Sequence, residues 1–205
     1  HYEITAIQAL ENKQNRGYQL VADPAAADQS IVFAGLGHKA GQDCEHIDRK
    51  ALGLPAKQVA LIQQTAAVNP NTVVVLINGS PLAMDEWLGD VSAVLEAWYG
   101  GQEAGNAIVS LLFGDSNPSA KLPVTFPRNI EDCSAHASPD TYPGGSEVHY
   151  NEGIMVGYRH YDAQGITPLF PFGHGLSYTE FNYQDLQLSV EADCIVIGLT
   201  LHNCG

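Results

Sequence analysis

Two short stretches of the chain are apolar at almost every position and rich in β-branched residues. They are residues 31–36, with the sequence IVFAGL, and residues 72–77, with the sequence TVVVLI. Strands that are covered on both faces have continuous apolar runs of this kind, as in a parallel sheet. The pattern therefore predicts two buried strands.

Two other segments have the periodicity of amphipathic helices. Residues 58–69 lie between the two apolar runs, carry an apolar stripe and end at Pro70, where a helix stops because proline lacks a backbone N–H. The chain thus predicts a strand, a helix and a parallel strand in succession. Residues 101–114 repeat apolar positions at helical spacing and end at Gly114, which predicts a second helix.

Three later segments indicate strands. Residues 91–99 have the apolar spacing of a helix, but the alternating α/β order of the chain favours a strand, and both interpretations stay open. Residues 121–127, with the sequence KLPVTFP, predict a short strand. Residues 195–202 alternate apolar side chains with others, which is the period of a half-exposed antiparallel strand.

A long segment without periodicity, residues 127–150, is rich in Pro, Gly, Ser, Asp and His and predicts a surface excursion.

Together the segments predict the α/β fold class, with an open and mostly parallel sheet sandwiched by helices. A truncated β-sandwich segment is expected to begin near Thr179. Both ends of the chain resemble cuts, so we expect further sequence beyond them.

The composition argues against several kinds of partner. The chain has 205 residues, and its 9 basic and 23 acidic residues give a formal net charge of −14. This charge disfavours binding to nucleic acid or to an anionic membrane surface. No apolar run approaches the roughly 18 residues of a membrane span, and no targeting peptide is visible. We expect neither nucleic acid nor membrane as a partner.

The cysteines and histidines lack the spacing of a metal site, with no CxxC pair and no HExxH motif. If residues 194–204 form one extended strand, its two cysteines lie roughly 33 Å apart and cannot form a disulfide with each other. We therefore expect no metal ion and no cofactor. The cysteines and histidines considered as metal ligands are Cys44, Cys133, Cys194, Cys204, His136, His149, His160 and His174.

Residues 35–40, with the sequence GLGHKA, formally match the G-x-G-x-x-A pattern of dinucleotide-binding proteins. That pattern opens a helix and is followed about 20 residues later by an acidic residue. Here a polar loop follows, and residues 54–58 contain no acid. We interpret the segment as a turn from strand to loop that requires small residues.

Charged residues gather directly behind the first apolar run, at Asp43, Glu45, Asp48 and Arg49. In open α/β sheets, ligands bind in the crevice outside the carboxyl ends of the strands, so the position favours a functional site. The alternative is a solvated loop with a surface ion pair between Asp48 and Arg49, worth well under about 1 kcal/mol.

Four motifs, which occur in order, resemble those of glycoside hydrolase family three, the family of β-glucosidases and β-xylosidases. Residues 44–87 resemble its segment E-G-x-D-R…L-x-L-P-x-x-Q…N-P-N-T-V-V-V…G-x-P, and residues 97–127 its segment A-W-Y-x-G-Q-E-x-G…K-L-P-x-T-x-P. Residues 150–162 resemble its segment Y-x-E-G-I-x-V-G-Y-R-x-Y. Residues 168–183 resemble its hinge into a fibronectin-III-like module.

The resemblance implies a retaining mechanism that uses two domains. A (β/α)8 barrel carries the aspartate nucleophile and most sugar contacts, and an α/β sandwich lends a loop with the acid/base glutamate. Residues 1–178 then form most of the sandwich, without its opening strand, and residues 179–205 form the first strands of a fibronectin-III-like domain. The implied substrate is a terminal non-reducing β-linked sugar, as for a β-glucosidase, and the implied location is secreted or periplasmic.

The resemblance assigns the acid/base role to Glu45, which begins the match to E-G-x-D-R. A general acid near neutral pH needs a pKa above the usual carboxyl value, from desolvation or from a neighbouring negative charge. A loop that docks against another domain obtains both, so Glu45 is expected to act only when the barrel closes over it. The chain alone is then inactive. Glu152, in the match to Y-x-E-G-I, is the rival acid.

The same match gives four neighbours a supporting role in the substrate loop, namely Asp43, His46, Asp48 and Arg49. His46 stands where the family has glycine. Arg49 is expected to hold the loop by charge-assisted bonds to Asp48 or to backbone carbonyls. The competing function is a domain without catalysis that buttresses a barrel or binds a glycan.

Three aromatic residues and a sequon each have two interpretations. Trp87, Trp98 and Tyr99 fit a sugar-stacking platform, but in apolar segments such residues more often belong to the core. Residues 78–80, Asn-Gly-Ser, fit a glycosylation sequon, but Pro81 follows. We interpret them as a turn after the second strand.

Overall fold

The computed structural model describes residues 3–14 and 17–205 of the chain. The described chain divides into two compact units. The first unit extends to Val109 and resumes from Lys121 to His174, and the second consists of Ser110–Ala120 and Gly175–Gly205.

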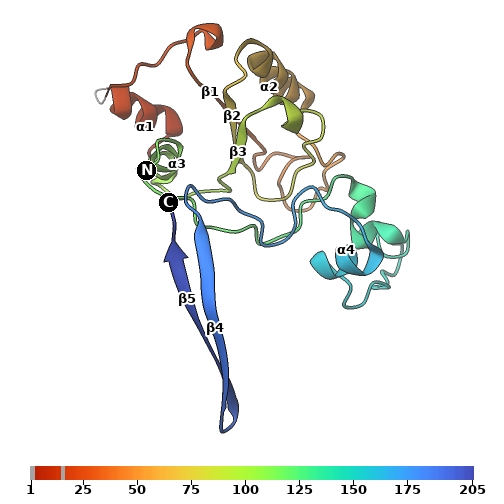
Figure 1. Ribbon diagram of the computed structural model, residues 1–205. Helices are drawn as coiled ribbons and strands as arrows, with labels where there is room; N and C mark the ends of the chain where they lie inside the picture. The colour runs from red at the N-terminus through yellow and green to blue at the C-terminus, as the bar shows by residue number, and fades with distance from the viewer. Residues whose placement is uncertain (1–2, 15–16) are drawn as a thin grey trace. The chain divides into compact units, whose positions relative to one another are not determined.

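The first unit is built on a three-stranded parallel sheet with the order β1-β2-β3 (Figure 1). Its strands are β1 (Ser30–Gly35), β2 (Thr72–Ile77) and β3 (Ala93–Glu96). Helix α2 (Ala56–Val68) connects β1 with β2 and contacts both strands. The α/β class, the two buried strands and the helix between them are confirmed.

The core is centred on β2, which has a strand on either side. Val74, Val75 and Leu76 of this strand are completely buried. Ile62 of α2 and the indole of Trp87 belong to the same apolar cluster as Val74 and Leu76. Burial on both faces is the reason why the strand has an uninterrupted apolar sequence.

Strand β3 confirms a strand within residues 91–99 and excludes the helix alternative there. It has only 4 residues and ends at Glu96. Trp98 then adopts a positive φ of 52°, which lies outside the β region and turns the chain away from the sheet.

The short strand expected at residues 121–127 is wrong. This segment makes one isolated bridge, in which the Phe126 N–H donates to the Phe170 carbonyl at 2.8 Å. The Leu122 N–H also donates to the His174 carbonyl at 2.8 Å. Among the described residues, no backbone bond from Val124, which lies midway between these two donors, joins them into a ladder.

Three further α-helices are α1 (Ala6–Lys13), α3 (Ala104–Leu112) and α4 (Tyr158–Gln164). Helix α3 is the second helix that the sequence predicts, whereas α1 and α4 are not predicted. Helix α1 begins at a capping box, in which Thr5 and Gln8 bond to each other's backbone. This signal is present in the sequence.

Short 3-10 helices cover Pro24–Ala26, Leu88–Asp90, Ile130–Asp132 and Ser134–Ala137. All of residues 127–150 are described, and they contain the last two of these turns but no α-helix or strand. The predicted long excursion is confirmed.

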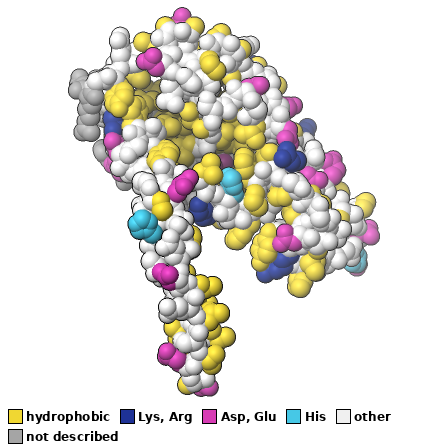
Figure 2. Space-filling view, viewed as in Figure 1, with side chains coloured by type: hydrophobic (Ala, Val, Ile, Leu, Met, Phe, Trp, Pro, Cys, Tyr) yellow, Lys and Arg dark blue, Asp and Glu magenta, His cyan; other side chains and the backbone are white. Residues whose placement is uncertain are grey.

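The second unit contains an antiparallel hairpin of β4 (Phe181–Glu191) and β5 (Cys194–Asn203), which confirms the antiparallel strand predicted near residue 195. Leu188 pairs with Ile197, and Figure 2 shows hydrophobic side chains along one side of the hairpin. Every residue of both strands is exposed. The assignment to a fibronectin-III-like module stays a prediction.

Candidate functional site

The segments that follow β1, β2 and β3 lie at one edge of the sheet, because the carboxyl ends of parallel strands lie together. The loop after β1 contains the charged residues of the expected site, from Asp43 to Arg49. The turn after β2 begins at Asn78, and the turn after β3 contains Trp98 and Tyr99. Three separate parts of the sequence thus contribute to the edge.

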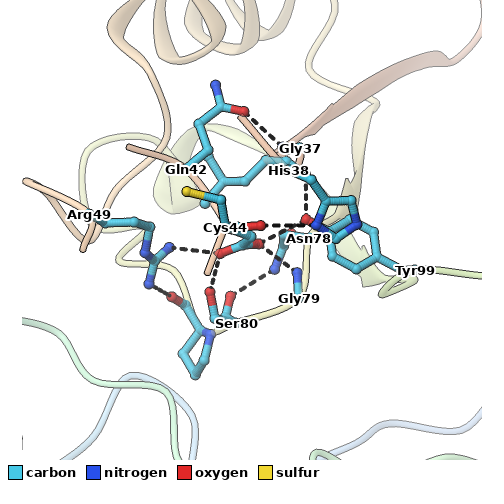
Figure 3. A network of polar contacts seen from close by, with 12 residues as sticks. Gly37, His38, Gln42, Cys44, Arg49, Asn78, Gly79, Ser80 and Tyr99 are labelled. Atoms are coloured by element: carbon cyan, nitrogen blue, oxygen red, sulfur yellow. Dashed lines mark hydrogen bonds and ion pairs between the residues drawn. The ribbon is translucent and has the colours of Figure 1, made fainter. Parts of the chain in front are cut away.

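The carboxylate of Asp43 is the centre of a hydrogen-bonded network at this edge. Its Oδ2 accepts from the Gly79 N–H at 2.6 Å and lies 3.1 Å from the Tyr99 hydroxyl, and its Oδ1 accepts from the Ser80 hydroxyl. Arg49 Nη1 lies 3.9 Å from Oδ1. Figure 3 shows Arg49, Gly79, Ser80 and Tyr99 gathered around the point where these contacts converge. The Asp43 side chain is only 9% exposed.

Two opposing influences act on the pKa of Asp43. Burial raises the pKa, but hydrogen bonds from Ser80, Gly79 and Tyr99 and the positive charge of Arg49 together outweigh burial and lower the pKa below its usual value. Asp43 is therefore an anion at neutral pH. This carboxylate is suited to anchoring the loop and unsuited to donating a proton.

Arg49 and Asp48 point to different partners. Arg49 Nη2 donates to the Pro81 carbonyl at 2.9 Å, so the backbone partner expected for this arginine is present. Its carboxylate partner is Asp43 and not Asp48, which corrects the expected pair. Asp48 instead accepts from the Tyr142 hydroxyl at 2.8 Å, so its partner comes from the excursion of residues 127–150.

Glu45 projects from the loop into solvent. Its side chain is 94% exposed, and its Oε2 lies 3.9 Å from Nε2 of the equally exposed His46. The contacts of Glu45 itself therefore do not determine where its carboxylate lies. Its acid/base role stays a prediction.

His46 adopts a positive φ of 70°. This left-handed conformation costs an ordinary residue energy but is freely available to glycine. The resemblance noted above places a glycine at this position, so the conformation of His46 is the one that such a glycine would adopt without strain.

Glu96 is a second, half-buried carboxylate at this edge, and it is not among the site residues predicted from the sequence. Its Oε1 accepts from the Trp98 N–H at 3.1 Å, and its Oε2 lies 3.4 Å from Asn78 Nδ2. Burial, together with the negative charge of Asp43, outweighs these two hydrogen bonds and raises the pKa of Glu96 to about 7. The signal in the sequence was a single acid within the apolar run of residues 93–99.

The turn after β2 confirms the interpretation of residues 78–80 as a turn. Asn78 is completely buried and its Nδ2 donates to the Ser80 carbonyl at 2.9 Å, so it is not accessible for glycosylation. Gly79 is required because a Cβ there would lie 2.7 Å from the Tyr99 ring. The ring of Tyr99 thus packs directly on this turn.

The remaining candidates lie elsewhere. Among the described residues, no hydrogen bond or ion pair joins Glu152 to the loop that carries Glu45, and Glu152 Oε2 is buried without a hydrogen-bond partner. Trp87 is buried and Trp98 packs against the core, which confirms the core interpretation for both. Tyr99 belongs to the polar network instead.

Within residues 3–14 and 17–205, no group of three His, Cys, Asp or Glu side chains is arranged to hold a metal ion. The four cysteines are free thiols. No helix in the described part of the chain is long and apolar enough to span a membrane.

Comparison with known proteins gives a consistent result. Residues 1–178 match the Glycosyl hydrolase family 3 C-terminal domain. The chain is 46% identical over 185 residues to a β-glucosidase of Rhizobium radiobacter, which covers 88% of this chain and 22% of that protein. It is 47% identical over 165 residues to thermostable β-glucosidase B of Acetivibrio thermocellus, covering 80% of this chain and 21% of that protein.

Solved structures agree with the sequence matches. The family 3 β-glucosidase of Bifidobacterium adolescentis superposes with a TM-score of 0.86 at 33% identity, over 98% of this chain and 32% of that one. The β-glucosidase DesR of Streptomyces venezuelae, solved in complex with D-glucose, gives a TM-score of 0.81 at 37% identity, over 97% of this chain and 24% of that one. The chain thus spans a minor part of the proteins it matches.

Proposed function

The chain belongs to glycosyl hydrolase family 3, and from this premise we propose that it is the α/β domain of a larger retaining β-glycosidase of the β-glucosidase type. In this proposal Glu45 is the acid/base residue, and a (β/α)8 barrel outside this chain supplies the nucleophile and most sugar contacts. The substrate is a terminal non-reducing β-linked sugar. Residues 179–205 begin a fibronectin-III-like domain, and the enzyme is secreted or periplasmic by analogy with the family.

One observation carries the catalytic part of the proposal. The E-x-x-D-R sequence of residues 45–49 lies in a loop at the carboxyl edge of a parallel sheet, the edge at which α/β proteins bind ligands. Its glutamate is exposed while the carboxylate two residues earlier is buried. An exposed side chain on an anchored loop is able to reach a substrate that another domain binds. Closure of that domain supplies the desolvation that a general acid needs.

The proposal is tested by comparing Glu45→Gln with Glu152→Gln in the full-length protein, using aryl β-glucosides, β-xylosides and N-acetylglucosaminides. Glu45→Gln is expected to lower kcat/KM for substrates with poor leaving groups by about 10²-fold to 10⁴-fold, the usual contribution of a general acid. Azide restores turnover of activated substrates by Glu45→Gln, because it replaces the water that needs a general base. Glu152→Gln is the matched control, and azide does not restore it.

Two results would contradict the proposal. One is unchanged hydrolysis of poor leaving groups by Glu45→Gln. The other is hydrolysis by residues 1–205 alone, since the proposed nucleophile lies outside this chain. A full-length protein that binds glycans but hydrolyses none of the three substrate classes supports the non-catalytic alternative.

A further inference from the structure

The carboxylate of Asp43 joins the exits of all three strands of the sheet. Gly79 and Ser80 follow β2, and Tyr99 follows β3. The Tyr99 hydroxyl also lies 2.7 Å from the carbonyl of Leu36, directly after β1, so its single proton is shared between the two acceptors. A single side chain in the loop thus contacts, directly or through one hydroxyl, every strand end that borders the site.

The backbone of Asp43 is held as well as its side chain. His38 Nδ1 lies 3.0 Å from the Asp43 carbonyl oxygen and donates to it in the tautomer with the proton on Nδ1. The Gly37 N–H donates to Gln42 Oε1 at 2.8 Å, and this bond joins the two ends of the segment 37–42. The His38 ring lies 4.7 Å from the ring of Tyr99. Residues 37–43, the first part of the loop, are therefore held in place by these contacts.

Glu96 holds in place the two turns to which Asp43 bonds, the turn after β2 and the turn after β3. This second carboxylate contacts Asn78, one residue before Gly79, and the backbone of Trp98, one residue before Tyr99. The two carboxylates thus bind the same two turns at neighbouring residues. Trp98 has a left-handed backbone that its N–H bond to Glu96 stabilises, so the turn presents Tyr99 to Asp43 in one orientation.

Glu45, two residues after Asp43, lacks such contacts. Its carboxylate has one contact at 3.9 Å, with an exposed histidine. The place from which Glu45 projects is therefore decided by its anchored neighbours and not by its own interactions. A displacement of about 1 Å in a reacting group is able to cost about 10²-fold in rate, so the anchor matters for catalysis.

We infer that Asp43 is a positioning residue for the acid/base glutamate, because its buried carboxylate fixes the stem of the loop to the exits of β2 and β3 and so fixes where Glu45 enters the site. The inference rests on the proposed role of Glu45. Asp43 acts through Glu45 and does not itself touch the substrate.

The test is Asp43→Asn in the full-length protein, assayed with a series of β-glucosides whose leaving groups differ in pKa. Asparagine has nearly the same size but replaces one acceptor oxygen with a donor that faces the donors of Gly79 or Ser80. Because only poor leaving groups depend on general acid assistance, kcat/KM for alkyl glucosides is expected to fall about 10-fold to 10²-fold, and for dinitrophenyl glucoside less than about 3-fold.

Two further variants guard against a folding defect. Tyr99→Phe and Ser80→Ala each remove one hydroxyl from Asp43 and keep the packing, and both are expected to give the same leaving-group dependence at about 3-fold to 10-fold. The matched control is Asp85→Asn, which removes a half-exposed carboxylate that lies 2.7 Å from Arg128 Nη1. It is expected to leave kcat/KM unchanged for every substrate.

The outcomes separate this inference from the proposed function. If Glu45→Gln shows no leaving-group dependence, the proposed function fails and the inference fails with it. If Glu45→Gln shows the dependence while Asp43→Asn, Tyr99→Phe and Ser80→Ala lower kcat/KM equally for all leaving groups or not at all, the proposed function survives and the positioning role of Asp43 is overturned. If Asp43→Asn does not fold, Tyr99→Phe and Ser80→Ala decide by the same criterion.

Discussion

Strand β2 of the sheet and strand β5 of the hairpin are both rich in apolar β-branched residues, yet they differ completely in burial. Leu76 in the sheet is 0% exposed, whereas Leu188 in the hairpin is 66% exposed. A parallel strand with neighbours on both sides and a helix across its face excludes water, but a lone two-stranded hairpin has too little surface to do so. The difference teaches that the same residue types form a rigid support for a site in one unit and an uncovered face in the other.

The largest effect is expected from truncating one leucine in each unit. Leu76→Ala leaves a cavity in a closely packed core and is expected to lower the free energy of unfolding by about 2 to 5 kcal/mol. Leu188→Ala removes a side chain that is already in water, so the expected change is within about 0.5 kcal/mol. Urea denaturation of both variants of residues 1–205 measures the contrast, and equal losses of the free energy of unfolding would contradict it.

A smaller effect is expected from adding one methyl group to a glycine in each unit. Gly79→Ala brings a Cβ within 2.7 Å of the Tyr99 ring, and the shift that follows is expected to cost about 1 to 3 kcal/mol. Gly198→Ala in β5 meets no atom within 4 Å and is expected to be neutral or slightly stabilising, because it lowers the entropy of the unfolded chain. Thermal melting of the two variants tests this, and a stable Gly79→Ala protein would show that the turn yields.

A third effect concerns the pH dependence of the free energy of unfolding, through Glu96. Its pKa is raised to about 7 from the ordinary value of 4.5, so between these values the folded state keeps a proton that the unfolded state has released. By linkage, the Glu96 contribution makes the fold less stable as pH rises through this window. Glu96→Gln removes this contribution, so wild type is expected to lose Tm relative to the variant between about pH 5 and about pH 8.

The hairpin supplies the control for this measurement. Glu191, at the end of β4, is an exposed carboxylate, and Glu191→Gln is expected to leave the difference in Tm from wild type the same at both pH values. A Glu96→Gln protein whose Tm differs from wild type by the same amount at acidic and neutral pH would show that Glu96 does not titrate in this window.

The sheet could be predicted where a local pattern coincides with a tertiary environment. The apolar runs at residues 31–36 and 72–77 mark strands covered on both faces, and α2 carries the stripe that packs on them. The strand expected at residues 121–127 failed because composition suggested β structure, while only Leu122 and Phe126 donate to residues 170–174 and no ladder forms between them. Glu96 was missed because the sequence does not show that the side chain of Asn78 and the backbone of Trp98 lie beside it.

By itself, the sequence determined the α/β architecture, the loop behind β1 and the motifs that establish the family, because each of these is written in neighbouring residues. Only the tertiary structure decided which carboxylates are buried and which is free. Asp43 meets Gly79 and Tyr99 across separations of 36 and 56 residues, and such contacts exist only when parallel strands bring their carboxyl ends to one edge. Glu45 lies two residues away and remains in water, since burial depends on what packs against a side chain and not on its place in the sequence.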